Sequence, residues 1–245
     1  LLSLGGPLRI PHLLPSGPNL FLNYQWTRNR NASVQSALVP GSAARSGMFP
    51  GAVIDPDIGV PFPGNRIPAG RISPQAQALL NLYPLPNFIS GGGYNYQAPL
   101  VNSTHQDALQ SRFTKNLGRR DGIYGRFAFE SFRSGTPSIF SFLDNGNMLG
   151  LDAGLNWSHR FNAHLFLNLG YQFSRLTSRT IPYFENRANI SGLAGISGNH
   201  QDPGDWGPPA LVFSSGIAEL SDAQSSLQRN QTGAVSYSLL WNRGR

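Results

Sequence analysis

The chain contains no cysteine among its 245 residues, which excludes a disulfide framework and thiolate chemistry. Charge is also scarce, since 13% of the residues are charged, about half the share usual in a soluble protein. No apolar run approaches the roughly 20 residues of a membrane-spanning helix. The 28 glycines and 19 prolines disfavour a bundle of long helices. Two classes remain: a loop-rich soluble β protein, and a membrane β-barrel whose apolar residues alternate with polar ones.

Lysine is nearly missing as well. Lys115 is the only lysine among the 19 basic residues, so arginines supply the rest of the positive charge; the net charge is +7. The arginines are dispersed, with only Arg119 and Arg120 adjacent, so a solvated or lumenal surface explains them better than a nucleic-acid-binding stripe. We expect no nucleic-acid partner. The sequence also has no starting methionine and no signal peptide, and we expect the chain to be part of a longer protein.

Catalytic signatures are absent too. The five histidines show no metal-ligand spacing, and no serine lies in a nucleophile elbow. We therefore expect no enzyme, no cofactor and no metal. Two loop groups, Asp55 with Asp57 and His200 with Asp202 and Asp205, could bind a divalent cation weakly. Solvated carboxylates are the better interpretation, because calcium requires six to eight oxygen ligands.

What recurs along the chain is period-two alternation. It predicts six strands, at 19–27, 107–116, 121–132, 150–160, 164–178 and 231–242. The clearest is 164–178, where Leu165, Leu167, Leu169, Tyr171 and Phe173 alternate with mostly polar residues. Between the strand ends, no charge falls on the apolar face. The charged residues Arg112, Arg126, Glu130 and Asp152 all fall on the opposite face.

The connections alternate between long and short. Long segments at 28–106, 133–149 and 179–230 are separated by short ones at 117–120 and 161–163. Outer-membrane barrels combine short periplasmic turns with long outer loops, whereas compact soluble domains rarely contain such long structureless loops. The predicted fold is therefore all-β: an antiparallel membrane β-barrel segment of six to seven strands of a larger barrel. Residues 1–245 form this incomplete barrel, with long outer loops at 28–106 and 179–230.

This topology sends the first, third and fifth strands outward. Trp157 and Trp241 then fall at the periplasmic interface, and Trp26, Phe129, Tyr171 and Phe173 fall near the outer one, where amphipathic rings settle. Strand propensity explains the presence of aromatic residues but not their position near strand ends. We expect outer-membrane lipid as a partner, with Arg175 and Arg179 able to reach headgroups, and the outer membrane of a Gram-negative bacterium as the location.

One short helix is expected inside the first long loop. Ser73 can cap it, Pro74 suits its first position, and Tyr83-Pro84 ends it. Leu79, Leu80 and Leu82 would then need burial against other loop residues, which predicts a partly folded outer cap.

The same loop carries a recognisable motif. Residues 65–74, Asn-Arg-Ile-Pro-Ala-Gly-Arg-Ile-Ser-Pro, followed by Leu79-Leu80 and by Tyr-Pro-Leu-Pro-Asn at 83–87, closely resemble the first large loop of Oar-like TonB-dependent outer-membrane receptors. The segment 5–8 before 20–24 is similar to the first barrel hairpin of that family. Residues 124–127 resemble a later strand, and 207–209 with 213–226 resemble an outer loop.

The resemblance implies a barrel of about 22 strands, gated by an N-terminal plug and energised through the TonB complex. Such a receptor imports a nutrient ligand too large for porins. The plug, the TonB-contacting box and the N-terminal domain are absent from this sequence, so TonB would act through the missing plug region, and no gating residue can be assigned. Arg112, Arg126, Glu130 and Asp152 are candidates for plug or ligand contacts, although solvation of the lumen accounts for them more simply.

An alternative from another class is a soluble β-rich binding or adhesion module. It requires a second sheet, built from residues 1–14 and loop segments, to cover the apolar face. A nucleic-acid-binding domain ranks third, because residues 122–129 only faintly resemble an aromatic RNA-binding strand.

Overall fold

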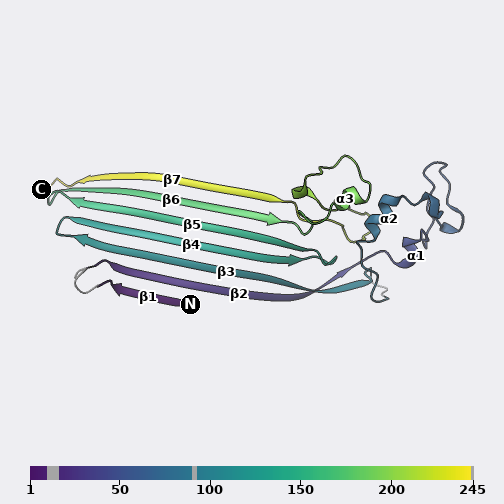
Figure 1. Ribbon diagram of the computed structural model, residues 1–245, viewed down its shortest axis with the longest axis horizontal. Coiled ribbons are helices and arrows are strands. Elements are labelled where there is room, and N and C mark those ends of the chain that lie inside the picture. Colours follow the sequence, from purple (N-terminus) through teal and green to yellow (C-terminus); the bar gives the residue numbers. More distant parts are fainter. Residues whose placement is uncertain (10–16, 90–92, 244–245) are drawn as a thin grey trace.

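The computed structural model describes residues 1–9, 17–89 and 93–243. Seven strands form one antiparallel sheet in chain order, and β1 and β7 are its edges (Figure 1). The strands are β1 (Leu2–Pro7), β2 (Asn19–Ala37), β3 (Tyr96–Leu117), β4 (Asp121–Pro137), β5 (Leu143–Arg160), β6 (Leu165–Ile181) and β7 (Ser226–Trp241). The predicted all-β, antiparallel fold is thus confirmed.

Among the described residues, short helices occur only in the connections at one end of the sheet. They are α1 (Ser42–Arg45), α2 (Pro74–Leu80) and α3 (Ile190–Leu193), with 3₁₀ turns at Pro63–Asn65, Ala69–Arg71 and Pro203–Asp205. The predicted loop helix is α2, in which Ser73 Oγ accepts a hydrogen bond from the Ala76 N–H at 3.1 Å. None of the helices in the described part of the chain is long and apolar enough to cross a membrane.

The strands are longer than predicted. β2 has 19 residues and β3 has 22, whereas about 9–11 are enough to cross the hydrocarbon layer. The connections therefore comprise 38–95, 138–142 and 182–225 instead of 28–106, 133–149 and 179–230. The added segments carry polar residues on both faces, such as Asn29, Arg30 and Asn31 on β2. Alternation disappears there because both faces meet water.

The strand register places all the alternating apolar residues on one face. Leu169 on β6 lies opposite Trp157 on β5 and Tyr237 on β7, and the neighbouring rows repeat this pattern. These side chains are uncovered, with Tyr237 82% and Tyr171 52% exposed. We call the apolar part of this face the apolar belt; on β6 it extends from Leu165 to Phe173.

Gly125 interrupts the apolar residues of β4 without leaving a gap. It lies directly opposite Phe113 on β3, and a Cβ atom at Gly125 would fall 2.0 Å from the Phe113 ring. The ring therefore lies over the glycine and fills the space that a side chain would occupy. This cross-strand cover keeps the apolar belt continuous between β3 and β5.

The second sheet that a soluble module requires is not found in the described residues. From the segment 1–14, the structure describes 1–9, and Leu2–Pro7 joins the same sheet as β1. β1 pairs with β2 from Leu2 opposite Tyr24 to Pro7 opposite Asn19, which agrees with the hairpin that the resemblance implied. The prediction of a covering sheet is wrong, because these residues extend the sheet sideways.

Three connections, two long and one of five residues, fold together at one end of the strands (Figure 1). We call residues 38–95, 138–142 and 182–225 the outer cap. Its core consists of the buried residues Val39, Leu79, Tyr83, Phe142, Phe184 and Leu220. Tyr83 Oη donates to the Ala218 carbonyl at 2.8 Å, and burial raises the Tyr83 pKa to about 12, so this donor stays protonated. The expected folding of the first long loop is confirmed.

Arg45 fixes the path of the first connection within the outer cap. Its guanidinium donates to the carbonyls of Pro40, Leu80, Tyr83 and Pro84 at 2.8–2.9 Å. A planar group with five donors can satisfy several carbonyls at once. Arg45 therefore joins the start of the connection to the C-terminal end of α2.

Candidate functional site

The face opposite the apolar belt is lined by amides, hydroxyls and glycine. We call it the polar face. One of its rows runs Asn23, Gln110, Ala128, Asp152, Ser174 and Thr232 from β2 to β7. Side chains of this kind hydrogen-bond to water or to a polar solute. The polar face therefore has the chemistry of the lumen of an outer-membrane barrel.

The four charged residues predicted for this face lie on adjacent strands. Arg112 on β3 is directly opposite Arg126 on β4. Arg126 Nε lies 3.3 Å from Asp152 Oδ1 on β5, and Glu130 Oε1 accepts a hydrogen bond from Gln106 Nε2 at 2.7 Å. These two positive and two negative groups, which we call the cluster, lie on β3, β4 and β5, and within it Arg126 and Asp152 are in contact. Their predicted contacts with a plug or a ligand remain a prediction.

Arg112 differs from the other three in its partner. Its guanidinium lies over the Phe21 ring, 5.1 Å from the centroid, and among the described residues it forms no ion pair with a carboxylate. A cation on an aromatic face keeps outward N–H donors available. Arg112 is therefore the member of the cluster best placed to bind an anionic group.

A shallow groove of about 290 Å³ crosses the polar face beside the cluster. Glu130 and Asp152 form part of its wall, and Gly150 on β5 lies directly opposite Glu130 and two residues from Asp152. Because Gly150 has no side chain, the groove remains open at that point. It gives the polar face a defined recess rather than a flat surface.

The six predicted interfacial aromatic residues all lie on the apolar face. Near the outer end, Trp26 stacks with Tyr24 at a centroid distance of 6.1 Å. At the opposite end, Trp157 Nε1 donates to Asp121 Oδ1 at 3.0 Å, and His159 Nδ1 lies 2.7 Å from the same oxygen. Trp241 is 68% exposed. The sequence analysis did not identify Asp121. Its position at a strand end, opposite His159 on the neighbouring strand, could have indicated it.

Within the outer cap, the connection 182–225 encloses a cavity of about 350 Å³. His200, Asp205 and Trp206 form one side of it, and Asp222 lies on another. Trp206 Nε1 donates to the Gln201 carbonyl at 3.0 Å, which fixes the indole. The cavity combines an aromatic ring with polar groups, a lining suited to a small polar ligand.

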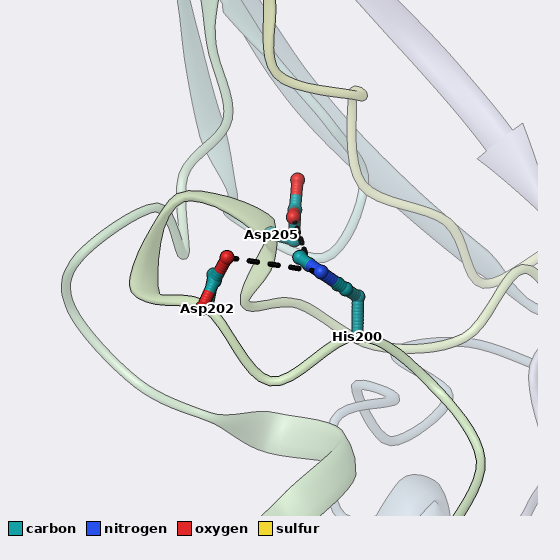
Figure 2. A group of neighbouring side chains, drawn as sticks. All are labelled: His200, Asp202 and Asp205. Carbon is teal, nitrogen blue, oxygen red and sulfur yellow. Dashed lines mark hydrogen bonds and ion pairs between the residues drawn. The ribbon is translucent and has the colours of Figure 1, made fainter.

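Figure 2 shows His200 between the carboxylates of Asp202 and Asp205. Its Nδ1 lies 2.5 Å from Asp205 Oδ2, and its Nε2 lies 3.7 Å from Asp202 Oδ2. The three side chains are 50–78% exposed. Three exposed ligands fall short of the coordination that calcium needs, and contacts to the imidazole already account for both carboxylates. The interpretation as solvated loop carboxylates is therefore retained.

The other acidic pair has a structural partner. Arg71 Nη2 lies 3.0 Å from Asp55 Oδ1 and 2.6 Å from Asp57 Oδ2. Asp55 is buried at 6% exposure, and a buried carboxylate is stabilised by a paired cation. Asp55 and Asp57 therefore hold the chain near the turn Ala69–Arg71 and are not free to bind a metal ion.

Two carboxylates meet where β5 enters the outer cap. Asp144 Oδ1 accepts from the Tyr183 N–H at 2.9 Å, and Asp222 Oδ2 accepts from the Phe184 N–H at 3.3 Å. Burial, together with the adjacent Asp144 carboxyl, raises the pKa of Asp222 to about 6. Asp222 therefore gains a proton in mildly acidic solution.

We expect the outer cap to be more stable at pH 5 than at pH 7.5. The pKa of Asp222 in the folded state, about 6, exceeds the unfolded value of about 3.9. Its stabilising contribution is thus complete below pH 4 and is lost as the pH rises through 6. Hydrogen-exchange protection factors at Tyr183 and Phe184 measure this effect. Asp222→Asn should abolish the pH dependence, and the exposed control Asp202→Asn should preserve it; equal protection at both pH values contradicts the prediction.

Comparison with known proteins places these features in one family. The family model described as an outer membrane beta barrel domain matches residues 2–245. No curated protein and no solved structure matches the chain. The family match agrees with the antiparallel sheet, the apolar belt and the polar face. The chain therefore belongs to the outer membrane beta barrel domain family and lies in the outer membrane of a Gram-negative bacterium.

Proposed function

We propose that this sheet is part of the barrel of a TonB-dependent receptor, which binds and imports a nutrient ligand too large for porins. The observation that carries the proposal is the folded outer cap at the end of a polar, charged face. In this mechanism the outer cap captures the ligand, and the polar face conducts it inward when a plug moves. In this proposal the chain binds and conducts the ligand, without catalysis.

The residues that resemble Oar-like receptors have structural roles in the outer cap. The segment 65–87 includes α2, and its Leu79 and Tyr83 belong to the buried core. A motif that builds the capturing surface is consistent with a receptor. Arg112 and the Arg126–Asp152 pair are the groups that we expect to contact the plug or the ligand.

Electrical conductance of the full-length protein in planar lipid bilayers tests the proposal. A receptor closed by a plug should give no steady ion current, whereas a porin gives a continuous one. Formaldehyde cross-linking in intact cells should also yield a covalent adduct with TonB, identified by mass spectrometry. A steady current together with the absence of a TonB adduct would contradict the proposal and indicate a diffusion channel.

A further inference from the structure

A row of arginines borders the apolar belt at its outer end. The row consists of Arg28 and Arg30 on β2, Arg133 on β4, Arg175 and Arg179 on β6, and Arg229 on β7. All six lie on the same face as the belt, because each is an even number of residues from a belt position on its own strand. We call them the arginine row. Only Arg175 and Arg179 were associated with headgroups from the sequence.

The register brings members of the arginine row close together. Arg28 lies opposite His105 on β3, which lies opposite Arg133, and Arg179 belongs to the same line across the sheet. On β7, Arg229 lies opposite Thr177 and is thus diagonal to both Arg175 and Arg179. Diagonal cross-strand neighbours lie within roughly 7–8 Å, so β6 and β7 present three guanidinium groups in one patch.

The arginine row follows the upper border of the apolar belt. On β2, Arg28 comes two residues beyond Trp26; on β6, Arg175 comes two residues beyond Phe173. The border does not follow a single row of paired residues. The row that contains Trp26 on β2 reaches β6 at Thr177, which lies two residues beyond Arg175. Strands of outer-membrane barrels are tilted. A plane parallel to the membrane surface therefore meets different rows of the register on different strands. Arg28 and Arg175, each two residues beyond the last aromatic residue of the belt on its strand, therefore lie at a similar depth, and Arg30 and Arg179 lie further out on the same two strands.

Positive charge exceeds negative charge along this border. Asp107 pairs with Arg28 at 2.8 Å and with Arg133 at 3.7 Å, and Glu185 pairs with Arg179 at 2.8 Å. Within the described part of the chain, Arg30, Arg175 and Arg229 form no ion pair. The six guanidinium groups are thus paired with only two carboxylates among the described residues. Two of the paired arginines, Arg133 and Arg179, remain at least half exposed, at 59% and 50%.

We infer that the arginine row binds the phosphate groups of the phosphorylated glycolipid in the outer leaflet. Guanidinium groups bind phosphate in bidentate geometry and are less strongly hydrated than ammonium groups. The acyl chains would contact the apolar belt directly below, and the phosphates would lie at the arginines. At the periplasmic border of the same face, Lys115 is the corresponding strand-borne cation among the described residues, and it lies in the same row as Trp157, with Ile123 between them. This inference does not depend on which ligand the barrel imports.

Native mass spectrometry of the full-length protein, delipidated in detergent, tests the inference. The two probes are bisphosphorylated lipid A and the same lipid after enzymatic removal of its phosphates. The unaltered protein should bind the phosphorylated form at least about tenfold more tightly, because its charge-assisted hydrogen bonds to the guanidinium groups are lost without phosphate. Equal binding of the two lipids overturns the inference, and this comparison requires no variant.

Variants then locate the site on the sheet. Arg175→Gln combined with Arg229→Gln should weaken binding of the phosphorylated lipid about tenfold or more, and the control Lys115→Gln should leave it unchanged. Folding of each variant is checked by its heat-dependent mobility in gel electrophoresis. If the first pair does not fold, Arg30→Gln with Arg133→Gln tests the other end of the row. An equal loss in Lys115→Gln, or no loss in a folded double variant, overturns the assignment.

Discussion

Replacement of Leu169 by arginine is expected to prevent stable assembly of the sheet in a lipid bilayer. Leu169 lies near the middle of the apolar belt, between Trp157 and Tyr237. An arginine at the bilayer midplane of an outer-membrane barrel costs about 2–4 kcal/mol. Urea titration of the full-length protein folded into phospholipid vesicles measures this loss in the free energy of unfolding.

The adjacent residue provides a matched control. Asn168 lies on the polar face, opposite Ser158 and Ser238, where an arginine meets water. Asn168→Arg should therefore change the free energy of unfolding by less than about 1 kcal/mol. If Asn168→Arg is as damaging as Leu169→Arg, or if Leu169→Arg has no effect, the assignment of the two faces is wrong.

Replacement of Leu220 by alanine is expected to unfold the outer cap while the sheet remains assembled. Leu220 is fully buried, at 0% exposure, in the core that joins the three connections of the outer cap. A buried leucine truncated to alanine typically costs about 2–5 kcal/mol, a large amount for a core of six buried residues. Protease added to intact cells should then cleave within 182–225, and mass spectrometry of the fragments identifies the sites.

Leu193 serves as the control for this experiment. It belongs to α3 in the same connection but is 80% exposed, so Leu193→Ala should leave the protease resistance of the outer cap unchanged. Resistance of Leu220→Ala to external protease at the level of the unaltered protein would show that the buried cluster does not stabilise the cap. The heat-dependent gel mobility of both variants should match that of the unaltered protein.

The sequence predicted those parts of the strands that touch lipid, and it missed the parts that do not. Between Leu165 and Phe173 every second residue is apolar, because one face must exclude charge from the hydrocarbon layer. On β2 beyond Arg28, both faces are polar, and the alternation on which the prediction depended disappears. The strand ends were therefore placed about ten residues too early on β2 and too late on β3.

Local interactions were likewise easier to predict than distant ones. The start of α2 depends on Ser73 and Pro74, which are adjacent in the sequence, and the structure confirms it. The core of the outer cap depends on contacts such as Tyr83 with Ala218, 135 positions apart. Spacing rules that consider only acidic residues also do not predict that Arg71 pairs with Asp55.

For the functional surfaces, too, the sequence predicts which face a residue occupies but not its contacts with other strands. Arg112, Arg126, Glu130 and Asp152 were placed on one face by alternation alone, but the Arg126–Asp152 contact depends on the pairing of β4 with β5. The arginine row depends on register across six strands. Arg28 and Arg229 lie near opposite ends of the sequence, and only the ladder of pairings between them brings both to the border of the belt.

Site-directed spin labelling along β6 tests the central claim most directly. Residues 1–245 contain no cysteine, and any cysteine elsewhere in the full-length protein is first replaced by serine, so that each single cysteine introduced from 165 to 174 carries the label. In full-length protein reconstituted into lipid vesicles, labels at odd positions should be accessible to oxygen, which dissolves in lipid. Labels at even positions should instead be accessible to a water-soluble nickel complex, with a period of two. Accessibility of all ten positions to the nickel complex, or the opposite phase, would contradict the membrane-spanning arrangement.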